Sequence, residues 1–141
     1  MGTRFSGRCL CGAVTYECSS DPIVMGNCYC RDCQRATGSG FAAGILVPRS
    51  AVTVTGEVRY YDVVADSGQV ISRGFCPICG SRLFGKGDAA PERMSITAGS
   101  LDDPAIFRPQ ADIYASSAQP WVQMNPRLPK FSKMPPMPRL P

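Results

Sequence analysis

Hydrophobic and polar residues alternate along much of the chain, which is the pattern of a β-strand with one buried face. The clearest runs are residues 13–18 and 52–55. Further strand-like segments, separated by glycine, proline or aspartate, are 41–47, 69–75, 81–84, 94–98 and 112–115. Many short strands with no helical patterns between them predict an all-β, antiparallel fold.

Two local patterns refine this prediction. The turn Thr55-Gly56-Glu57 joins the run 52–55 to a second run, 58–64, and predicts a β-hairpin. One short helix is expected over residues 31–37, where Gly38 would end it. The stretch 130–141 is basic and contains four prolines, so we expect a single domain over residues 1–129 followed by a loose tail.

Composition indicates an ordinary globular protein. Of 141 residues, 44% are hydrophobic and 18% are charged, which argues against a disordered chain. No apolar run approaches the roughly 20 residues of a membrane span. The first residues lack the apolar segment of a secretion signal, so a cytoplasmic protein is expected.

The net charge of +4 is modest, and part of it comes from basic residues near the C-terminus. Basic residues form no continuous run, and few aromatic residues lie among them. Nucleic-acid binding is therefore not favoured.

The chain contains eight cysteines and no histidine, which is unusual for an ordinary globular protein and points to a specific role for sulfur. Cytoplasmic thiols are normally reduced, so the cysteines call for an explanation other than disulfides. A zinc site in this chain would have to be built mainly from sulfur.

Two cysteine pairs lie far apart in the chain. Cys9 and Cys11 are separated by one residue, so on an extended segment their side chains would face the same way. Cys76 and Cys79 belong to the segment CPICG, in which Gly80 would supply a left-handed turn. The four thiolates predict a tetrahedral, structural zinc site. Free buried thiols and a redox-active pair are the alternatives, but a redox motif is expected in an α/β pattern.

A third group, Cys28, Cys30 and Cys33, lies within six positions. The first two would share one side of an extended segment, and Cys33 would lie in the first turn of the short helix. Three ligands leave one position of a tetrahedral zinc open for water or substrate. Arg31 and Arg35 add positive charge nearby, which favours thiolates.

Cys18 leaves two interpretations of this third group open. As a fourth ligand it would close the site and make it structural. As a small apolar residue at the end of a strand it would leave the site open.

Four segments carry a resemblance to a known family: CLCGAV, CYCRDCQRATGSGF, FCPICGSRLFG and GSLDDPAIFRPQADIYASSAQPWV. In this order they resemble the glutathione-dependent formaldehyde-activating enzymes, a family that also includes centromere protein V. The likeness extends from about residue 7 to residue 121. It implies an antiparallel, β-tent-like zinc-binding fold and formation of S-hydroxymethylglutathione from formaldehyde and glutathione, a carbon–sulfur lyase reaction. It also implies a structural zinc on one set of cysteines (Cys9, Cys11, Cys76 and Cys79) and a catalytic zinc on the other (Cys28, Cys30 and Cys33).

The chain departs from the family pattern at two positions. Family members often have histidine where Tyr29 stands, and many have histidine where Asp112 stands. Without histidine, proton transfer falls to a carboxylate, a tyrosine or metal-bound water, so Tyr29 and Asp112 are candidate catalytic residues.

Other residues near the third cysteine group are candidates for binding the substrate. The carboxylates of glutathione would meet arginines, for which Arg31, Arg35 and Arg82 are candidates. Ser39 and Phe41 follow the helix closely and would line the pocket. A competing hypothesis is a non-catalytic, zinc-stapled module that binds a protein or nucleic acid, with both sulfur sites structural.

Overall fold

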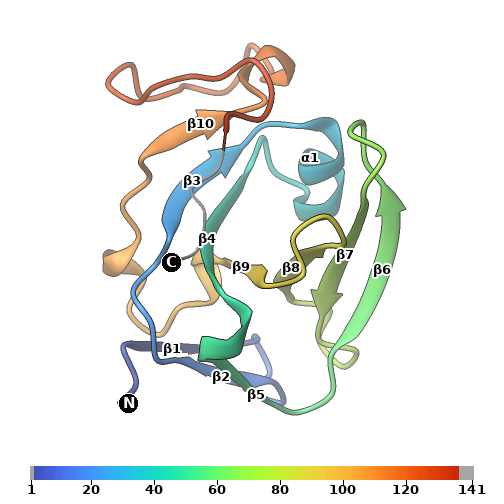
Figure 1. Ribbon diagram of the computed structural model, residues 1–141, viewed down its shortest axis with the longest axis vertical. Coiled ribbons are helices and arrows are strands. Elements are labelled where there is room, and N and C mark those ends of the chain that lie inside the picture. The colour runs from blue at the N-terminus through green and yellow to red at the C-terminus, as the bar shows by residue number, and fades with distance from the viewer. Residues whose placement is uncertain (1, 137–141) are drawn as a thin grey trace.

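The structure, a computed structural model, describes residues 2–136 (Figure 1). Within this range ten strands form two sheets, accompanied by one α-helix, α1 (Arg31–Thr37), and four short 3₁₀ turns. The turns are η1 (Arg49–Ala51), η2 (Ala98–Ser100), η3 (Pro104–Ile106) and η4 (Ala115–Ser117). None of the helices found there has the length and apolar character needed to cross a bilayer. The predicted mostly-β fold with one short helix is confirmed, including the bounds of the helix.

The smaller sheet has the order β1-β2-β5, and all its pairs are antiparallel. Its strands are β1 (Phe5–Arg8), β2 (Thr15–Cys18) and β5 (Val52–Thr55). The larger sheet has the order β10-β3-β4-β9-β8-β7-β6. Its strands are β3 (Val24–Cys28), β4 (Ala42–Pro48), β6 (Arg59–Val64), β7 (Val70–Phe75), β8 (Arg82–Gly87), β9 (Arg93–Thr97) and β10 (Ala111–Ile113).

The structure corrects two details of the predicted topology. Strand β10 runs parallel to β3, so the larger sheet is mixed and not wholly antiparallel. The predicted hairpin over 52–64 is wrong, because β5 pairs with β2 while β6 pairs with β7. Gly56, with φ 101°, turns the chain from one sheet to the other. A Cβ at this position would lie 2.1 Å from the carbonyl oxygen of Ala13, so the turn requires glycine. Strands β1 and β3 were not predicted.

The core lies between the two sheets. Tyr16 of β2 packs edge-to-face on Phe84 of β8, with ring centroids 5.4 Å apart at an interplanar angle of 73°. Ile45 and Ile96 are paired across β4 and β9, and both are fully buried. Burial of these large apolar side chains fixes the sheets against each other and so positions the loops that carry the cysteines.

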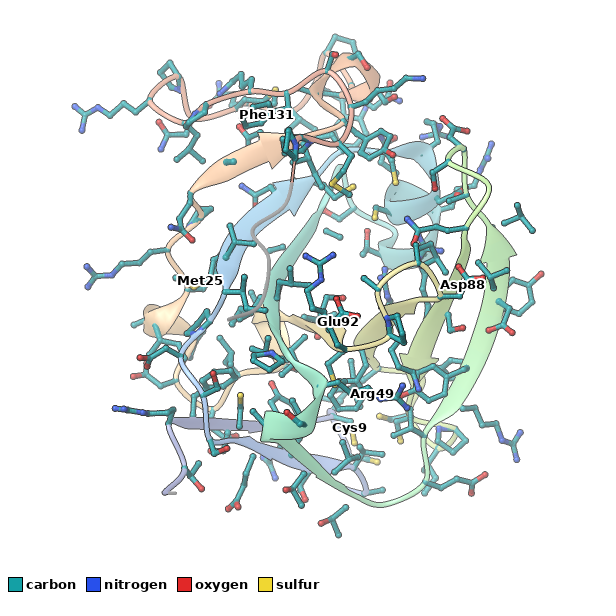
Figure 2. The ribbon with its side chains drawn as sticks, viewed as in Figure 1. Cys9, Met25, Arg49, Asp88, Glu92 and Phe131 are labelled. Atoms are coloured by element: carbon teal, nitrogen blue, oxygen red, sulfur yellow. The ribbon has the colours of Figure 1, made fainter. Side chains whose placement is uncertain are left out.

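The C-terminal segment runs along β10. The backbone N–H of Phe131 donates to the carbonyl of Asp112 (2.9 Å), and Ala115 N–H donates to the carbonyl of Phe131 (2.9 Å). Figure 2 shows Phe131 beside β10, at the opposite end of the molecule from Cys9. Residues 137–141 of the expected tail lie outside the described residues.

Candidate metal centres

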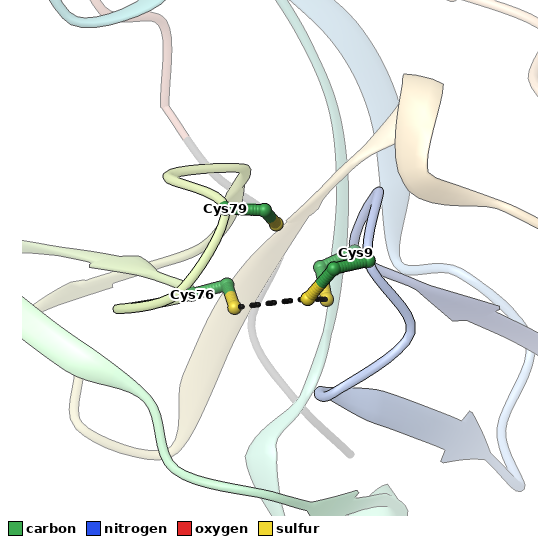
Figure 3. Close-up of side chains that lie close together, drawn as sticks. Cys9, Cys76 and Cys79 are labelled. Carbon is green, nitrogen blue, oxygen red and sulfur yellow. Dashed lines mark hydrogen bonds between the residues drawn. The ribbon is translucent and has the colours of Figure 1, made fainter.

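The four cysteines of the two distant pairs come together in space. Their sulfurs all lie within 4.8 Å of one another, and Figure 3 shows those of Cys9, Cys76 and Cys79 pointing toward a common centre. The Sγ–Sγ distance is 3.6 Å from Cys9 to Cys11 and 3.8 Å from Cys11 to Cys76. A tetrahedral zinc with Zn–S distances of about 2.3 Å has edges of about 3.8 Å. These four residues, hereafter the four-cysteine centre, therefore fit a zinc ion.

Each pair sits in a tight turn that ends in a left-handed glycine. Gly12 has φ 81° and donates its N–H to the carbonyl of Cys9 (3.2 Å). Gly80 has φ 76° and donates to the carbonyl of Cys76 (2.8 Å). The role predicted for Gly80 is confirmed. The expectation that Cys9 and Cys11 lie on an extended segment is wrong, since a turn brings their sulfurs together.

Hydrogen bonds to sulfur act unevenly at this centre: the pKa of Cys9 and of Cys79 is lowered, whereas at Cys11 the Ala13 N–H, which lowers the pKa, is outweighed by burial and the neighbouring thiols, which raise it to about 11. Backbone N–H groups donate to the sulfurs of Cys9 (from Val14, 3.3 Å) and Cys11 (from Ala13, 3.4 Å). The hydroxyl and backbone N–H of Ser81 lower the pKa of Cys79 to about 5. Zinc ligation requires deprotonated thiols, so these donors prepare the site for a metal. A metal here would join the turn after β1 to the turn between β7 and β8.

A second group of sulfurs lies where β3 ends and α1 begins. Cys28 is the last residue of that strand, Cys30 is the N-cap of α1, and Cys33 lies in its first turn. Their sulfurs are within 4.8 Å of one another. The backbone N–H of Cys33 donates to the sulfur of Cys30 (3.3 Å), so one cysteine caps the helix that carries the next. These three residues, hereafter the three-cysteine centre, fit three corners of a zinc tetrahedron.

The three-cysteine centre favours a negative charge at Cys33. Hydrogen bonds from the thiols of Cys28 and Cys30, helped by the charge and a hydrogen bond of Arg73, lower the pKa of Cys33 to about 2. The guanidinium Nη2 of Arg73 lies 4.0 Å from the Cys33 sulfur. The same contacts raise the pKa of Cys28, because its proton is shared with its neighbours. An anionic sulfur beside a fixed cation is suited to metal binding.

A second arginine stands next to Arg73. Arg82 begins β8, the neighbour of β7, and the charges of the three-cysteine centre act on it. Burial lowers the pKa of Arg82, and those negative charges oppose that effect. The Nε atoms of Arg73 and Arg82 and the Nη1 atom of Arg82 are buried without a hydrogen-bond partner in the described structure. Buried donors of this kind are rare and call for an explanation.

Cys18 does not join the three-cysteine centre. It is fully buried in the core cluster, and its thiol contacts the carbonyl of Ser20 at 3.5 Å. Among residues 2–136, no other cysteine, histidine or carboxylate joins the three sulfurs. Burial raises the pKa of Cys18, as expected for a thiol among apolar side chains.

Tyr29 and Asp112, the candidates for proton transfer, lie on the other side of β3 from the sulfurs. Tyr29 is flanked by Cys28 and Cys30 on extended backbone, so its side chain points away from both. Asp112 is paired with Asn27 in the register, and accepts a hydrogen bond from it (3.1 Å). Its other carboxylate oxygen accepts from Nζ of Lys130 (3.1 Å). The fully buried carboxylate is thus already engaged in an ion pair.

Of the five candidates for binding the substrate, Arg82 and Phe41 line a cavity, and Arg31, Arg35 and Ser39 do not. Phe41 lies against Tyr29 with ring centroids 5.2 Å apart and lines a cavity. The side chain of Arg31 donates to Gln34 on its own helix. Arg35 and Ser39 are exposed and line neither described cavity.

The helix is tied to the segment after β10 by one buried amide. Gln34 Nε2 donates to the carbonyl oxygens of Tyr29 (2.7 Å) and Ser117 (3.0 Å), and its Oε1 accepts from Gln119 (3.1 Å). These bonds hold α1, and with it Cys33, at the end of β3. The sequence signal for this role was a polar residue, glutamine, on the buried face of a short helix.

Two further residues near the three-cysteine centre were missed from the sequence. Arg73 lies inside the strand segment VISRGF, where a lone charge in an apolar run was the only signal. Tyr114 is the one residue other than glycine in the described range with positive φ (53°). It follows Ile113, which is paired with Cys28. Burial raises the pKa of Tyr114, and the negative charges of Cys28 and Cys30 raise it further. Its backbone conformation cannot be read from the sequence.

A cavity of about 740 Å³ borders the four-cysteine centre, where Cys9 lines it, whereas Cys28, Cys30 and Cys33 do not line it. One wall comes from the end of α1 and the start of β4, and the opposite wall from the turns of the four-cysteine centre and the strands after them. Residues lining it include Thr37, Phe41, Ala42, Ser81, Arg82 and Thr97. Its volume suits a small-molecule ligand.

Comparisons with known proteins agree with this architecture. The family model described as "Glutathione-dependent formaldehyde-activating enzyme" matches residues 4–117. A protein of Penicillium rubens, named "Putative glutathione-dependent formaldehyde-activating enzyme", is 37% identical over 81 residues. That alignment covers 56% of this chain and 42% of the relative, so the similarity spans less than half of the relative's length. The crystal structure of a Rhodobacter sphaeroides protein superposes with a TM-score of 0.56 at 19% identity. The superposition covers 89% of this chain and 98% of the other and supports the fold.

Proposed function

Because the chain belongs to the glutathione-dependent formaldehyde-activating enzyme family, we propose that it joins formaldehyde to the thiol of glutathione. The reaction is of the carbon–sulfur lyase type and also runs in reverse. The observation that supports this most strongly is the convergence of three sulfurs with no fourth protein ligand among the described residues. An open coordination position distinguishes catalytic from structural zinc sites.

Cys28, Cys30 and Cys33 would hold the catalytic zinc, and the four-cysteine centre would hold a second, structural zinc. At the three-cysteine centre a zinc ion supplies a Lewis acid that lowers the pKa of an incoming thiol. The chain's own contribution is to stabilise the anionic sulfur of Cys33, and Arg73 serves this purpose through its contact with that sulfur. Gln34 positions the helix that carries Cys33.

The addition step is balanced without an oxidant or reductant. The thiol sulfur of glutathione forms a bond to the carbon of formaldehyde, and the π pair of the carbonyl moves to its oxygen. That oxygen takes up one proton, equivalent to the proton released by the thiol. The product is the S-hydroxymethyl thioether, and the reverse step breaks the same C–S bond.

Tyr114 is our candidate for the proton transfer. It follows the β10 residue that is paired with Cys28, and Asp112 and Tyr29 lie on the far side of β3. Its left-handed backbone costs about 1–3 kcal/mol, and strain of this kind concentrates at functional sites. A phenol at this place would give its proton to the developing alkoxide and recover it from the thiol.

The proposed chemistry requires reduced thiols and a thiol substrate. All eight cysteines are free in the structure, which is consistent with a reducing compartment such as the cytoplasm. Glutathione is the thiol named by the family, and we propose it as the small-molecule partner.

The test uses ¹³C-formaldehyde and glutathione with the purified, zinc-loaded protein. Exchange NMR measures the rate at which label moves between free formaldehyde and the S-hydroxymethyl adduct. We expect the protein to raise this rate above the uncatalysed value, and the Cys28→Ser variant to lose the increase. An unchanged exchange rate at full zinc loading would exclude the proposed activity.

A further inference from the structure

The larger sheet ends in a strand with one unpaired edge. Strand β6 pairs with β7 along its whole length, from Arg59 to Val64, and has no second neighbour in the strand order. Figure 1 shows β6 at the outer edge of the molecule. Its residues are exposed except Val63, and Tyr61 (69%) and Val64 (68%) are the most exposed hydrophobic ones. An open edge of this kind is a template for pairing with another chain.

The direction of the backbone groups of β6 follows from the turn after it. The N–H of Ala65 donates to the carbonyl of Gln69 (2.9 Å), and these two residues continue the β6–β7 register. Hydrogen-bonded pairs alternate with non-hydrogen-bonded pairs in an antiparallel ladder, so the backbone of every second residue faces β7. Tyr60, Asp62 and Val64 are the intervening residues. Their N–H and C=O groups therefore point outward, and they have no hydrogen-bond partner among residues 2–136.

Two other sheet edges are covered by the chain itself. Along β10, the N–H of Asp112 donates to the carbonyl of Pro129 (2.9 Å), and the N–H of Phe131 donates to the carbonyl of Asp112 (2.9 Å). Beside β1, Gly7 forms an isolated antiparallel bridge with Leu101. The sequence of β6, RYYDVV, contains neither the proline nor the lysine that commonly protects an edge. Its aromatic and β-branched residues instead favour pairing with a further strand.

A second copy of this chain fits the edge in one register. A two-fold axis perpendicular to the sheet keeps each side chain on its own face, so the axis must pass beside a residue that faces its own copy. An axis at Asp62 would place two carboxylates opposite each other, which is unfavourable. An axis at Tyr60 would place Val64 opposite Gly56, which lies outside β6. With the axis at Tyr61, Tyr60 of each copy lies opposite Asp62 of the other, and the two pairs exchange about four backbone hydrogen bonds.

The side chains agree with the register centred on Tyr61. On one face the Tyr61 rings of the two copies would lie side by side, at a non-hydrogen-bonded pair where the backbones approach most closely. On the other face, Nζ of Lys86 lies 3.9 Å from the centroid of the Tyr60 ring. Asp62 of the second copy would stand directly opposite that ring, which brings a carboxylate toward the ammonium group. The two-fold axis repeats this complementary pair of charges.

We propose that two copies of this chain associate through β6, antiparallel and in the register centred on Tyr61, to form one continuous sheet across the dimer. The association involves none of the eight cysteines, so it is independent of the proposed reaction. A contact of one strand pair is smaller than the roughly 1,200 Å² of standard interfaces, so the dimer should dissociate on dilution.

Analytical ultracentrifugation of the zinc-loaded protein over a concentration series measures the association. We expect the average mass of wild type to rise with concentration from that of one chain toward that of two. Tyr61→Lys places two ammonium groups opposite each other at the axis and should weaken the dimer by about tenfold. Thr53→Lys, on the exposed edge strand β5 of the smaller sheet, is the matched control and should associate as wild type does. A wild-type protein that stays monomeric up to its solubility limit would overturn the proposal.

Opposite charges at one position test the register. An equimolar mixture of Tyr61→Lys and Tyr61→Glu should associate more tightly than either variant alone, because this register places residue 61 opposite its own copy. Tyr61→Phe keeps the aromatic pair and should associate as wild type does. If the mixture is no tighter than the separate variants, the register centred on Tyr61 is wrong.

A proline tests the backbone pairing. Asp62→Pro removes an outward N–H and leaves the bonds to β7, since an edge strand tolerates proline where its N–H faces away from the sheet. Asp62→Ala is the matched control, because it removes the carboxylate and keeps the N–H. We expect Asp62→Pro to abolish the dimer and Asp62→Ala only to weaken it, with circular dichroism to check that both fold. Equal association of the two variants would exclude edge pairing, and the Tyr61 variants decide the matter if Asp62→Pro does not fold.

Discussion

Nη2 of Arg73 lies 4.0 Å from the sulfur of Cys33, although the two residues are 40 positions apart in the chain. This contact gives the three-cysteine centre a fixed cation from β7, a strand that contributes none of its sulfurs. Because thiolates, not thiols, bind zinc, the cation favours the ligand form of the cysteines.

Replacement of Arg73 by Met should weaken zinc retention at the three-cysteine centre. The thiolates would lose a charged hydrogen-bond donor, which is worth about tenfold in affinity. Competition with a chromophoric zinc chelator at neutral pH measures this change, and Arg59→Met serves as the control. Identical zinc release from both variants would show that Arg73 does not support the metal.

The Cys76→Ser variant should lose cooperative folding. Structural zinc sites contribute about 10–16 kcal/mol of apparent binding free energy, as much as the whole stability of a typical domain. Cys76 is also fully buried in the core cluster, so the change acts on packing as well. Thermal unfolding followed by circular dichroism checks this, and a sharp transition in the variant would contradict a structural four-cysteine centre.

The Cys28→Ser variant should remain folded and bind one zinc fewer. The three-cysteine centre is partly exposed and lies outside the main core cluster, so the expected loss of stability is much smaller than in Cys76→Ser. Metal analysis by mass spectrometry should give about two zinc ions per chain for wild type and about one for the variant. A collapse of thermal stability would instead indicate a structural site.

Tyr114→Phe tests the proposed proton transfer. The variant keeps the ring and the left-handed backbone, so zinc content and thiol affinity should stay unchanged. The exchange rate between formaldehyde and adduct should fall about 100-fold, a typical contribution of general acid–base catalysis. Tyr61→Phe, at a residue that is 69% exposed, is the matched control. Full activity in Tyr114→Phe would remove this residue from the mechanism.

The ion pair of Asp112 and Lys130 predicts a structural role for the carboxylate. Lys130→Met would leave a buried charge without its cation and should cost about 2 kcal/mol, since the lysine is 33% exposed and partly screened. Adding Asp112→Asn to that variant should restore part of the loss, because the uncompensated charge is gone. Urea unfolding measures both effects. A catalytic Asp112 would behave differently: Asp112→Asn alone would abolish formaldehyde exchange while the protein stayed folded and zinc-loaded.

The two cysteine groups were predictable because the spacing of cysteines within a turn is a local property. Cys76, Cys79 and Gly80 lie within five consecutive positions, and a turn that brings two sulfurs to one metal has few solutions. The bounds of the helix followed for a similar reason, since Gly38 adopts the left-handed conformation that ends it. The hairpin over residues 52–64 was predicted wrongly because a turn does not determine which strands the two flanking segments pair with.

By itself the sequence determined the mostly-β class, the one helix and the division of seven cysteines into a set of four and a set of three. Only the tertiary structure decided which charged groups surround the set of three. The register of β10 on β3 turns Asp112 away from the sulfurs, and the pairing of β7 with β8 brings Arg73 and Arg82 toward them. The physical reason is range: cysteine spacing and helix caps act over a few residues. The charged residues near the sulfurs are brought there by pairing between strands that lie far apart in the sequence. That pairing depends on how the core packs.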